Sequence, residues 1–502
     1  MLPRAAGVLL HPTSLPGPHG VGDLGPASTA FLEWAASAGF RMWQVLPLGP
    51  TGYGHSPYGS PSAFAGNPLL ISPERLRDSG LLPRPALGPR PVFREGRVDF
   101  ARAAAWKETL LRAAFEHFRS HAPRRLRAAH DAWVAAAEQE FWLGDWALYS
   151  ALKSRHRDVS WTDWPAELRD REPAALAEAA RGLADDLAYH RFVQFVFARQ
   201  WDELRAEAHR LGVSILGDLP IYVAHDSADV WSRRELFQLD AAGQPNVVAG
   251  VPPDYFSPTG QRWGNPLYDW ARHAADGYRW WCERLRANLA RTDWVRLDHF
   301  RGFAAYWEVP AEEETAERGR WVEGPGLALF EALRGRLGKD LPLVAEDLGV
   351  ITDEVDALRE QLGLPGMKVL QFAFGEDDSP HAPHRHVARA VVYSGTHDND
   401  TTAGWYAALG AAERRSVDDY LGSGEPIAVR MVRAALTSVA DLAVLPLQDL
   451  LGLGSEARMN TPGEPAADWA WRTRKEAWTE ELATALLRVV RQTGRLRDQD
   501  AG

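Results

Sequence analysis

The sequence predicts an α/β fold, namely a (β/α)8 barrel with helical and loop-rich insertions between its strands. Three observations support this prediction. Eight apolar runs rich in β-branched residues recur along the 502-residue chain. Segments with helical periodicity lie between several of these runs, so strand and helix alternate. Several runs are continuously apolar, as expected for strands that helices cover on both faces. The pattern favours a barrel but also allows a doubly wound open sheet.

The eight expected strands follow one another along the chain. They are residues 7–11, 42–48, 213–223, 294–300, 341–348, 367–374, 390–397 and 439–448. The clearest helical segments between them are residues 29–38, 352–362, 413–421 and 427–437. Together these elements predict a single barrel domain over residues 1–502.

Two long intervals interrupt the alternation. Residues 69–190 are rich in Ala, Arg, Glu and Leu, show helical periodicity at 106–117 and 176–189, and predict a helical subdomain inserted after the second strand. Residues 226–276 contain Gly, Pro and aromatic side chains in loop-like order, and predict a loop-rich insertion after the third strand. Long ordered loops usually serve function.

Composition narrows the class of protein. The chain has 67 acidic and 56 basic residues and a net charge of −11, which disfavours a nucleic-acid partner. Its single cysteine, Cys282, excludes an intramolecular disulfide framework and agrees with a cytoplasmic location. No run is long enough to span a membrane, and the apolar start is too short for a signal sequence. No obligate protein partner is implied.

Four acids stand at the ends of predicted strands. Asp298, Glu346 and Asp398 lie in the short motifs RLDH, AED and HDND, and Asp218 occupies an equivalent place in the third run. The carboxyl ends of barrel strands meet at one mouth of the barrel, so these acids predict one active site. Any one of them could be structural, but four together are hard to explain by chance.

Arg296 and Asp298 are two residues apart in a predicted strand, so their side chains leave the same face. An arginine close to a carboxylate lowers the pKa of that carboxylate and favours its ionised form. Asp298 is therefore interpreted as a nucleophile. A buried structural Arg–Asp pair is an equally good interpretation of this motif alone.

Glu346 ends an apolar run and precedes Asp347. The apolar wall and the neighbouring acid are expected to raise the pKa of Glu346, as a general acid near neutral pH requires. The alternative is that Asp347 caps a helix and Glu346 is incidental. A nucleophile and an acid/base on either side of a bond, expected about 5–5.5 Å apart, are typical of retaining glycoside chemistry.

The motif that contains Asp398 offers a third carboxylate that could hold a sugar. A metal site is the alternative for this motif, but no cluster of His or Cys ligands accompanies it and the arginine at 296 would oppose a cation. We expect no bound metal.

Further motifs extend this pattern over nearly the whole chain. They are residues 7–16, 43–52, 56–58, 62–68, 250–256, 296–302, 345–349, 366–374 and 395–400. With these motifs in order, the chain resembles the amylomaltase (4-α-glucanotransferase, disproportionating enzyme) family, glycoside hydrolase family 77 of the α-amylase superclan.

The resemblance implies a role for each acid. Asp298 is expected to form a covalent β-glucosyl-enzyme, Glu346 to protonate the leaving O4 and then deprotonate the acceptor, and Asp398 to hold the donor sugar. The implied substrates are an α-1,4-glucan donor and a glucose or maltooligosaccharide acceptor. Arg296, His397 and Asp218 are expected beside the nucleophile and donor sugar. The neighbouring sugar subsites are expected to include Tyr58, Trp263, Asn265, Asp254 and Tyr255.

Three further expectations follow from the resemblance. Strict strand alternation would turn His397 away from Asp398, so a bend is needed at that strand end. The run after Asp218 lacks the calcium-binding asparagine of amylases, which implies no structural calcium and no cofactor. The last helices, within residues 469–493, leave no room for a C-terminal β-sandwich domain.

The acids alone do not separate transfer from hydrolysis, because both use the same glycosyl-enzyme. The aromatic loop 250–256 could shield that intermediate from water and stack an incoming glucan. Two alternatives stay open: an α-1,4-glucan hydrolase that uses the same residues, and an inactive glucan-binding protein.

Overall fold

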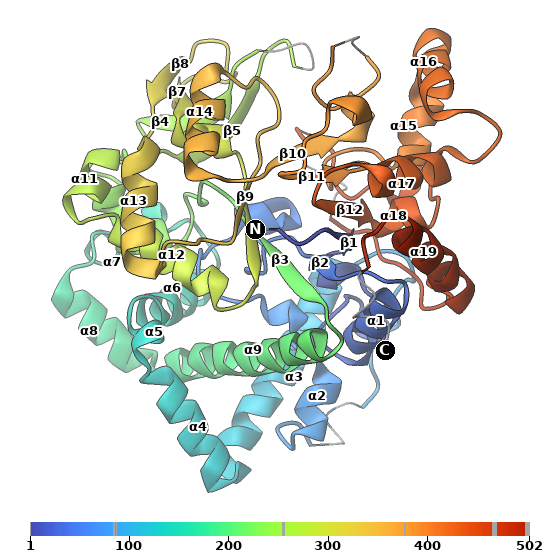
Figure 1. Cartoon of the computed structure of the whole chain (residues 1–502). Helices are drawn as coiled ribbons and strands as arrows, with labels where there is room; N and C mark the ends of the chain where they lie inside the picture. The colour runs from blue at the N-terminus through green and yellow to red at the C-terminus, as the bar shows by residue number, and fades with distance from the viewer. Residues whose placement is uncertain are drawn as a thin grey trace.

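Eight parallel strands form the centre of the fold (Figure 1). The computed structural model describes residues 2–496 except 84, 85, 87, 254–256, 376, 377 and 464–468. The barrel strands are β1 (Ala5–Leu9), β2 (Met42–Gln44), β3 (Ser214–Leu219), β6 (Trp294–Leu297), β9 (Leu343–Ala345), β10 (Gly366–Val369), β11 (Ala390–Tyr393) and β12 (Leu442–Pro446). Each overlaps one of the eight predicted runs. The observed strands are shorter because most of the runs continue into the loops that follow.

The sheet closes on itself. Its order is β10-β11-β12-β1-β2-β3-β6-β9, so the two edge strands, β9 and β10, are consecutive in the chain. The amide of Ala345 at the end of β9 donates to the carbonyl of Pro365, 2.9 Å away, just before β10. Across the same seam, the amide of Met367 donates to the Asp347 carboxylate over 2.6 Å. The barrel prediction is confirmed, and the open doubly wound sheet is excluded.

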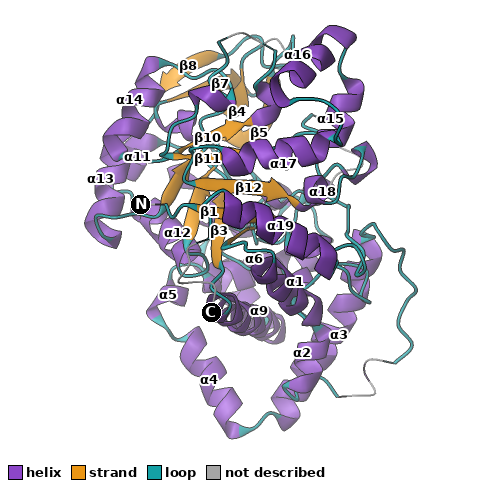
Figure 2. Ribbon diagram, turned by 45° about the vertical axis from the view of Figure 1, so that its right-hand side comes forward, coloured by secondary structure: helices purple, strands orange, loops and turns teal. Residues whose placement is uncertain are grey.

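Helices cover the outside of the barrel (Figure 2). The four clearest predicted helices are present as α1, α14, α16 and α17. The helices that alternate with or follow the barrel strands are α1 (Pro26–Ser37), α12 (Arg279–Leu289), α13 (Gly326–Leu337), α14 (Asp353–Leu362), α15 (Thr402–Ala408), α16 (Ala411–Leu421), α17 (Ile427–Thr437), α18 (Leu447–Leu450) and α19 (Glu480–Gln492). Residues 469–479, which the sequence groups with the last helices, precede α19 without forming a helix.

The interval between β2 and β3 is helical, as the periodicity indicates. Its helices are α2 (Pro73–Asp78), α3 (Phe100–His121), α4 (Arg124–Val134), α5 (Ala137–Glu140), α6 (Leu143–Arg155), α7 (Ala166–Arg169), α8 (Pro173–Gly182) and α9 (Ala184–Arg210). The predicted helix at 176–189 is interrupted at Leu183, where α8 ends and α9 begins. Helix α9 runs on past residue 190 without a break and leads directly into β3, so the helical stretch is longer than the sequence pattern suggests.

A second, antiparallel sheet flanks the barrel, and the sequence pattern does not predict it. Its order is β5-β4-β7-β8. The strands are β4 (Val247–Val251), β5 (Gln261–Pro266), β7 (Ala305–Pro310) and β8 (Arg320–Glu323); the short helices α10 (Ala228–Ser232) and α11 (Trp270–Ala275) lie before and after the first pair. Strand β4 pairs with β7 in the register Val248↔Val309, so two distant segments of the chain supply the sheet. Each strand is short, and β4 and β5 also contain an internal glycine, so none of the four stands out by itself.

The described part of the chain contains no helix that is both long and apolar enough to cross a membrane.

Candidate active site

Arg296 lies at the centre of a charged cluster inside the barrel. Its Nη1 is 2.8 Å from Asp298 Oδ1 and donates to both carboxylate oxygens of Asp218 over 2.9 and 2.8 Å. Arg296 and Asp218 are direct partners on the neighbouring strands β6 and β3, and both are buried. The side chain of Asp298, one residue beyond β6, keeps 26% exposure and therefore reaches the mouth. One arginine thus holds two of the four predicted acids.

Aromatic side chains pack together next to Asp218. The hydroxyl of Tyr58 donates to Asp218 Oδ2 over 2.8 Å. The ring of Tyr58 is stacked on the His397 ring, with centroids 5.1 Å apart and an interplanar angle of 13°. The ring of Trp469 contacts both, at 5.7 Å from Tyr58 and 5.9 Å from His397. Burial raises the pKa of Tyr58 well above its ordinary value, so its hydroxyl stays a donor.

Two backbone amides hold the carboxylate of Glu346. The amide of His299 donates to Oε2 over 2.7 Å, and the amide of Leu348 donates to Oε1 over 2.8 Å. His299 has φ 52° and ψ 52°, a left-handed conformation that is uncommon for a residue with a side chain. This turn lies directly after Asp298. Helix α14 begins at Asp353 with Thr352 as its N-cap, so helix capping by Asp347 does not explain the motif.

Burial dominates the ionisation of both central acids. It raises the pKa of Glu346 to about 7, opposed by Arg296 and reinforced by the charge of Asp298. This agrees with the expectation that the surroundings of Glu346 raise its pKa. Burial also raises the pKa of Asp298 to about 6, with Arg296 as the main opposing influence. Arg296 thus lowers the pKa of Asp298 as expected, but desolvation outweighs the ion pair and the net direction is upward.

Asp398 lies on the loop that follows β11. Its Oδ2 is 3.3 Å from His397 Nε2, and its Oδ1 accepts a 2.6 Å hydrogen bond from Asn460 Nδ2. Arg458 donates to the backbone carbonyl of Asp398 over 2.9 Å. Because β11 ends at Tyr393, strand alternation does not apply to His397 and Asp398, and the bend that the sequence requires is present. The side chain of Asp398 is 44% exposed, more than that of Asp298.

The side chains of residues 397–400 do not point toward one position, which argues against the metal alternative. Asn399 Oδ1 turns back to accept from Thr396, and Asp400 accepts from Ser455 over 2.6 Å. Among the residues that the structure describes, no group of three or more His, Cys, Asp or Glu is placed to hold a metal ion.

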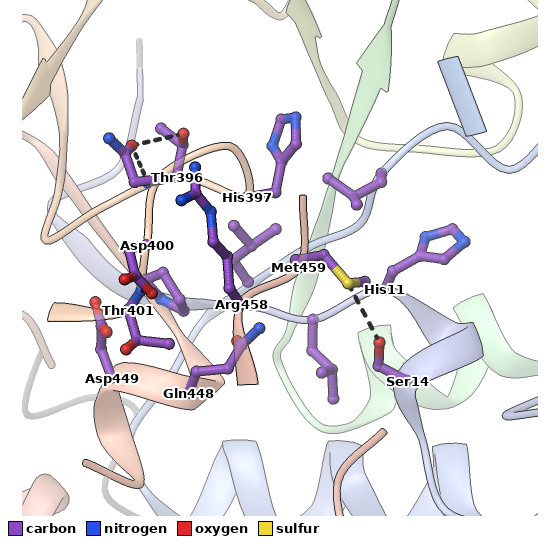
Figure 3. Close-up of a pocket in the computed structure, with 15 residues that line it drawn as sticks. His11, Ser14, Thr396, His397, Asp400, Thr401, Gln448, Asp449, Arg458 and Met459 are labelled. Atoms are coloured by element: carbon purple, nitrogen blue, oxygen red, sulfur yellow. Dashed lines mark hydrogen bonds between the residues drawn. The ribbon is translucent and has the colours of Figure 1, made fainter. Parts of the chain in front are cut away.

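A pocket lies next to the Asp398 loop, between the ends of β1, β11 and β12 (Figure 3). His397 and Arg458 line it, and so does His11, whose pKa burial lowers to about 3. The sequence does not single out His11, Arg458, Asn460 or Trp469 as site residues, because no acid or strand-end motif marks them. Their position in the first and eighth strand-to-helix loops is the signal that could have found them.

The remaining predicted subsite residues are Trp263, Asn265, Asp254 and Tyr255, and they differ in what the structure shows of them. Trp263 on β5 is 38% exposed, and its ring meets the His299 ring edge-on at 4.8 Å. Asn265 donates from Nδ2 to the carbonyl of Val223 over 2.8 Å, so its amide nitrogen fastens β5 to the loop after β3. The predicted subsite residues Asp254 and Tyr255 lie outside the described residues.

The sequence and the structure of this chain are similar to those of known proteins. The family model of glycoside hydrolase family 77, described as 4-alpha-glucanotransferase, matches residues 10–477. A 4-alpha-glucanotransferase of Thermus thermophilus is 51% identical over 506 residues, covering 99% of this chain and 100% of that protein. One from Synechocystis sp. is 48% identical over 497 residues, covering 98% of each. The structure of an amylomaltase from Streptococcus agalactiae in complex with acarbose superposes with a TM-score of 0.95 at 35% identity, covering 98% of this chain and 100% of that chain.

Proposed function

Because this chain belongs to glycoside hydrolase family 77 and is a 4-alpha-glucanotransferase of α-1,4-glucans, we propose that it works by a retaining double displacement. A segment of a donor maltooligosaccharide or amylose is transferred to the 4-hydroxyl of an acceptor glucose or glucan. Asp298 is the nucleophile, Glu346 is the acid/base, and Asp398 holds the donor sugar.

The observation that carries this assignment is the contrast between the surroundings of the half-buried Asp298 and the buried Glu346. Asp298 Oδ1 is 2.8 Å from the Arg296 guanidinium, which favours the ionised form that a nucleophile needs. Glu346 is held by two neutral amides, and the burial that raises its pKa to about 7 keeps a proton available near neutral pH. Two carboxyl groups whose surroundings differ in this way take different roles.

In the first step, Asp298 attacks the anomeric carbon of the donor while the bond from that carbon to O4 breaks. Glu346 gives its proton to O4, and the reducing-end part of the glucan leaves with a free 4-hydroxyl. Because Oδ1 faces Arg296, we assign the attack to Oδ2. The product is a covalent β-glucosyl-enzyme, and Glu346 is now a carboxylate.

In the second step, the 4-hydroxyl of the acceptor attacks the same carbon and gives its proton to Glu346. The bond to Asp298 breaks, which restores the aspartate carboxylate and retains the α-configuration. Asp398 is exposed enough to hydrogen-bond to the hydroxyls of the donor ring, and its contact with Asn460 fixes its direction. Trp263 offers an exposed ring for an adjacent sugar.

The experiment that tests transfer uses maltotriose as the only substrate. Glucose together with a ladder of maltooligosaccharides longer than maltotriose supports the proposal, because elongation requires a sugar acceptor. Glucose and maltose without any longer product would mean that water is the acceptor and would overturn it. Chromatography of the products over a time course separates early transfer from slow hydrolysis.

A further inference from the structure

The two amides that hold Glu346 belong to segments far apart in the sequence. His299 lies in the turn after β6, and Leu348 lies in the loop after β9. The Leu348 bond is local to the loop that carries Glu346, whereas the His299 bond crosses between the two segments and therefore requires them to keep a fixed separation. A carboxylate that must give and take a proton at one oxygen atom tolerates little displacement, since an error of about 1 Å can cost about 100-fold in rate.

Arg301 joins these two segments. It lies on the short helical turn Phe300–Phe303, two residues beyond His299. Its Nη1 donates to the carbonyl of Val350, two residues beyond Leu348. The backbone of Arg301 is therefore two residues from the His299 amide, and its guanidinium contacts a residue two positions from the Leu348 amide.

The guanidinium of Arg301 is anchored on the flanking antiparallel sheet. It is stacked on the ring of Trp321, with its central carbon 3.7 Å from the ring centroid. Trp321 on β8 is the cross-strand partner of Trp307 on β7, and the two rings meet edge-on at 5.2 Å. Trp307 in turn donates from its indole nitrogen to the carbonyl of Ala316 over 2.9 Å. Trp321 and Trp307, one on each of two paired strands, thus form an aromatic surface on which the guanidinium of Arg301 packs.

We propose that Arg301 is a positioning residue for Glu346, which it holds in register by fastening the loop after β9 to the turn after β6. The inference rests on the proposed role of Glu346 as acid/base. It also means that the flanking sheet affects the reaction, because Trp321 on β8 supports the guanidinium of Arg301.

The surroundings of Arg301 argue against a purely stabilising role. The residue is only 6% exposed, and its Nε has no hydrogen-bond partner among the described residues. A buried cation with one carbonyl acceptor and an unpaired nitrogen is a poor contributor to stability. Buried groups that contribute poorly to stability are expected where function requires them.

The charged groups on each side are few. Glu346 faces Arg296 and Asp298. Arg301 faces Glu354 at the start of α14 and also His299, whose pKa is lowered to about 3 by burial and, to a smaller extent, by the charge of Arg301. Replacing Arg301 with methionine keeps its length but removes the hydrogen bond and the charge. Replacing it with lysine keeps the charge and a donor but loses the planar stack on Trp321.

The test compares Arg301→Met, Arg301→Lys and the control Arg495→Met. Arg495 is a 1%-exposed arginine that also donates to backbone carbonyls, among them those of Leu436 and Ala5, at the opposite end of the barrel. For Arg301→Met we expect kcat on maltotriose to fall by about 10–100-fold with a smaller change in KM. We also expect the alkaline limb of the pH profile of kcat/KM to move to higher pH, because weaker amide donation disfavours the ionised form of Glu346. Arg301→Lys should recover part of both effects.

Arg495→Met should lower thermal stability and leave the alkaline limb in place. If Arg301→Met behaves in the same way, Arg301 is merely structural and the inference is wrong. Should Arg301→Met not fold, Trp321→Leu removes the stacking platform alone, and the same two changes are expected at smaller size; an unchanged kcat and pH profile in that variant would also overturn the inference. Glu346→Gln distinguishes a failure of the proposed function from a failure of this inference. Near-normal turnover of Glu346→Gln would refute the proposed function. If Glu346→Gln loses its turnover but Arg301→Met does not, only the role of Arg301 is refuted.

Discussion

At the scale of single residues, the acids of the barrel mouth differ mainly in what surrounds them. Asp298 is paired with a buried guanidinium, Glu346 accepts from two amides, and Asp398 is the most exposed of the three. Their types were visible in the sequence. The balance between burial and pairing was not, because desolvation depends on the whole mouth and not on the neighbouring residues in the chain.

The first residue-scale prediction concerns the two central acids. Asp298→Asn and Glu346→Gln should each lower kcat by at least roughly 10²–10⁴-fold while the circular dichroism spectrum stays that of the wild type. The matched control is Asp293→Asn, which changes an acid just before the other end of β6, where it pairs with Arg205 over 2.7 Å. This control should keep near-normal turnover even if it loses stability. A comparable loss in all three variants would mean that the acids act through the fold.

The second residue-scale prediction is a bell-shaped pH profile of kcat/KM. Below a pH of about 6, Asp298 becomes protonated and loses its nucleophilic form, so the rate falls. Above a pH of about 7, Glu346 loses the proton that the leaving O4 needs, so the rate falls again. Because the two acids interact, the position of each limb also depends on the charge of the other acid. Initial rates on both sides of this range would measure them, and a flat profile across it contradicts the assignment.

At the scale of elements, the helical insertion is fastened to the barrel by a buried lysine. Lys107 on α3 donates to the Asp23 carboxylate over 2.7 Å and to the carbonyls of Leu69 and Ile71 over 2.7 and 2.9 Å. All three of its protons are used. The loops that follow β1 and β2 therefore depend on a helix that lies outside the barrel.

We predict that Lys107→Met lowers the free energy of unfolding by about 3–5 kcal/mol, because it leaves a buried carboxylate and two carbonyls without their donor. Urea denaturation measures the difference. The control, Arg119→Met, removes an exposed cation from the same helix, whose partner is Asp185, and should lose less than about 1 kcal/mol. Adding Asp23→Asn to Lys107→Met should recover part of the loss; equal losses for the two single variants would show that the buried pair is not an anchor.

The elements also show where sequence patterns stop being informative. The eight barrel strands and the helices α1, α14, α16 and α17 were predictable, because their apolar pattern is local and continuous. Strands β4, β5, β7 and β8 were not, since the pairing Val248↔Val309 joins two segments separated by a barrel strand. Neither segment carries a strand signal strong enough to be recognised without its partner.

At the scale of the whole molecule, barrel closure depends on a glycine. A Cβ on Gly366 at the start of β10 would lie 2.2 Å from Asp347 Oδ2. That carboxylate cannot move freely, because it accepts from Met367 and lies 3.2 Å from Arg359. The seam between β9 and β10, which turns the sheet into a barrel, therefore needs a residue without a side chain.

We predict that Gly366→Ala lowers the free energy of unfolding by about 1–3 kcal/mol. Gly335→Ala is the control, because this glycine lies inside α13 and a Cβ there would meet no other side chain within 4 Å. Alanine at that position should stabilise the protein by about 0.5–1 kcal/mol. Thermal unfolding of the two variants should thus shift in opposite directions. Shifts of the same sign and size would mean that the seam accommodates the extra methyl group.

The sequence by itself determined the class of fold, the strand ends and the residue types at those ends, because these depend on local periodicity and on motifs that stay contiguous in the chain. It was enough to predict the family and to bring Asp298, Glu346 and Asp398 to one mouth of a barrel. Only the tertiary structure decided the net pKa direction of Asp298, the contacts of Asn460 and Trp469, and the fastening by Arg301. Each of these arises where segments distant in sequence pack together, and burial and hydrogen-bond geometry exist only after that packing.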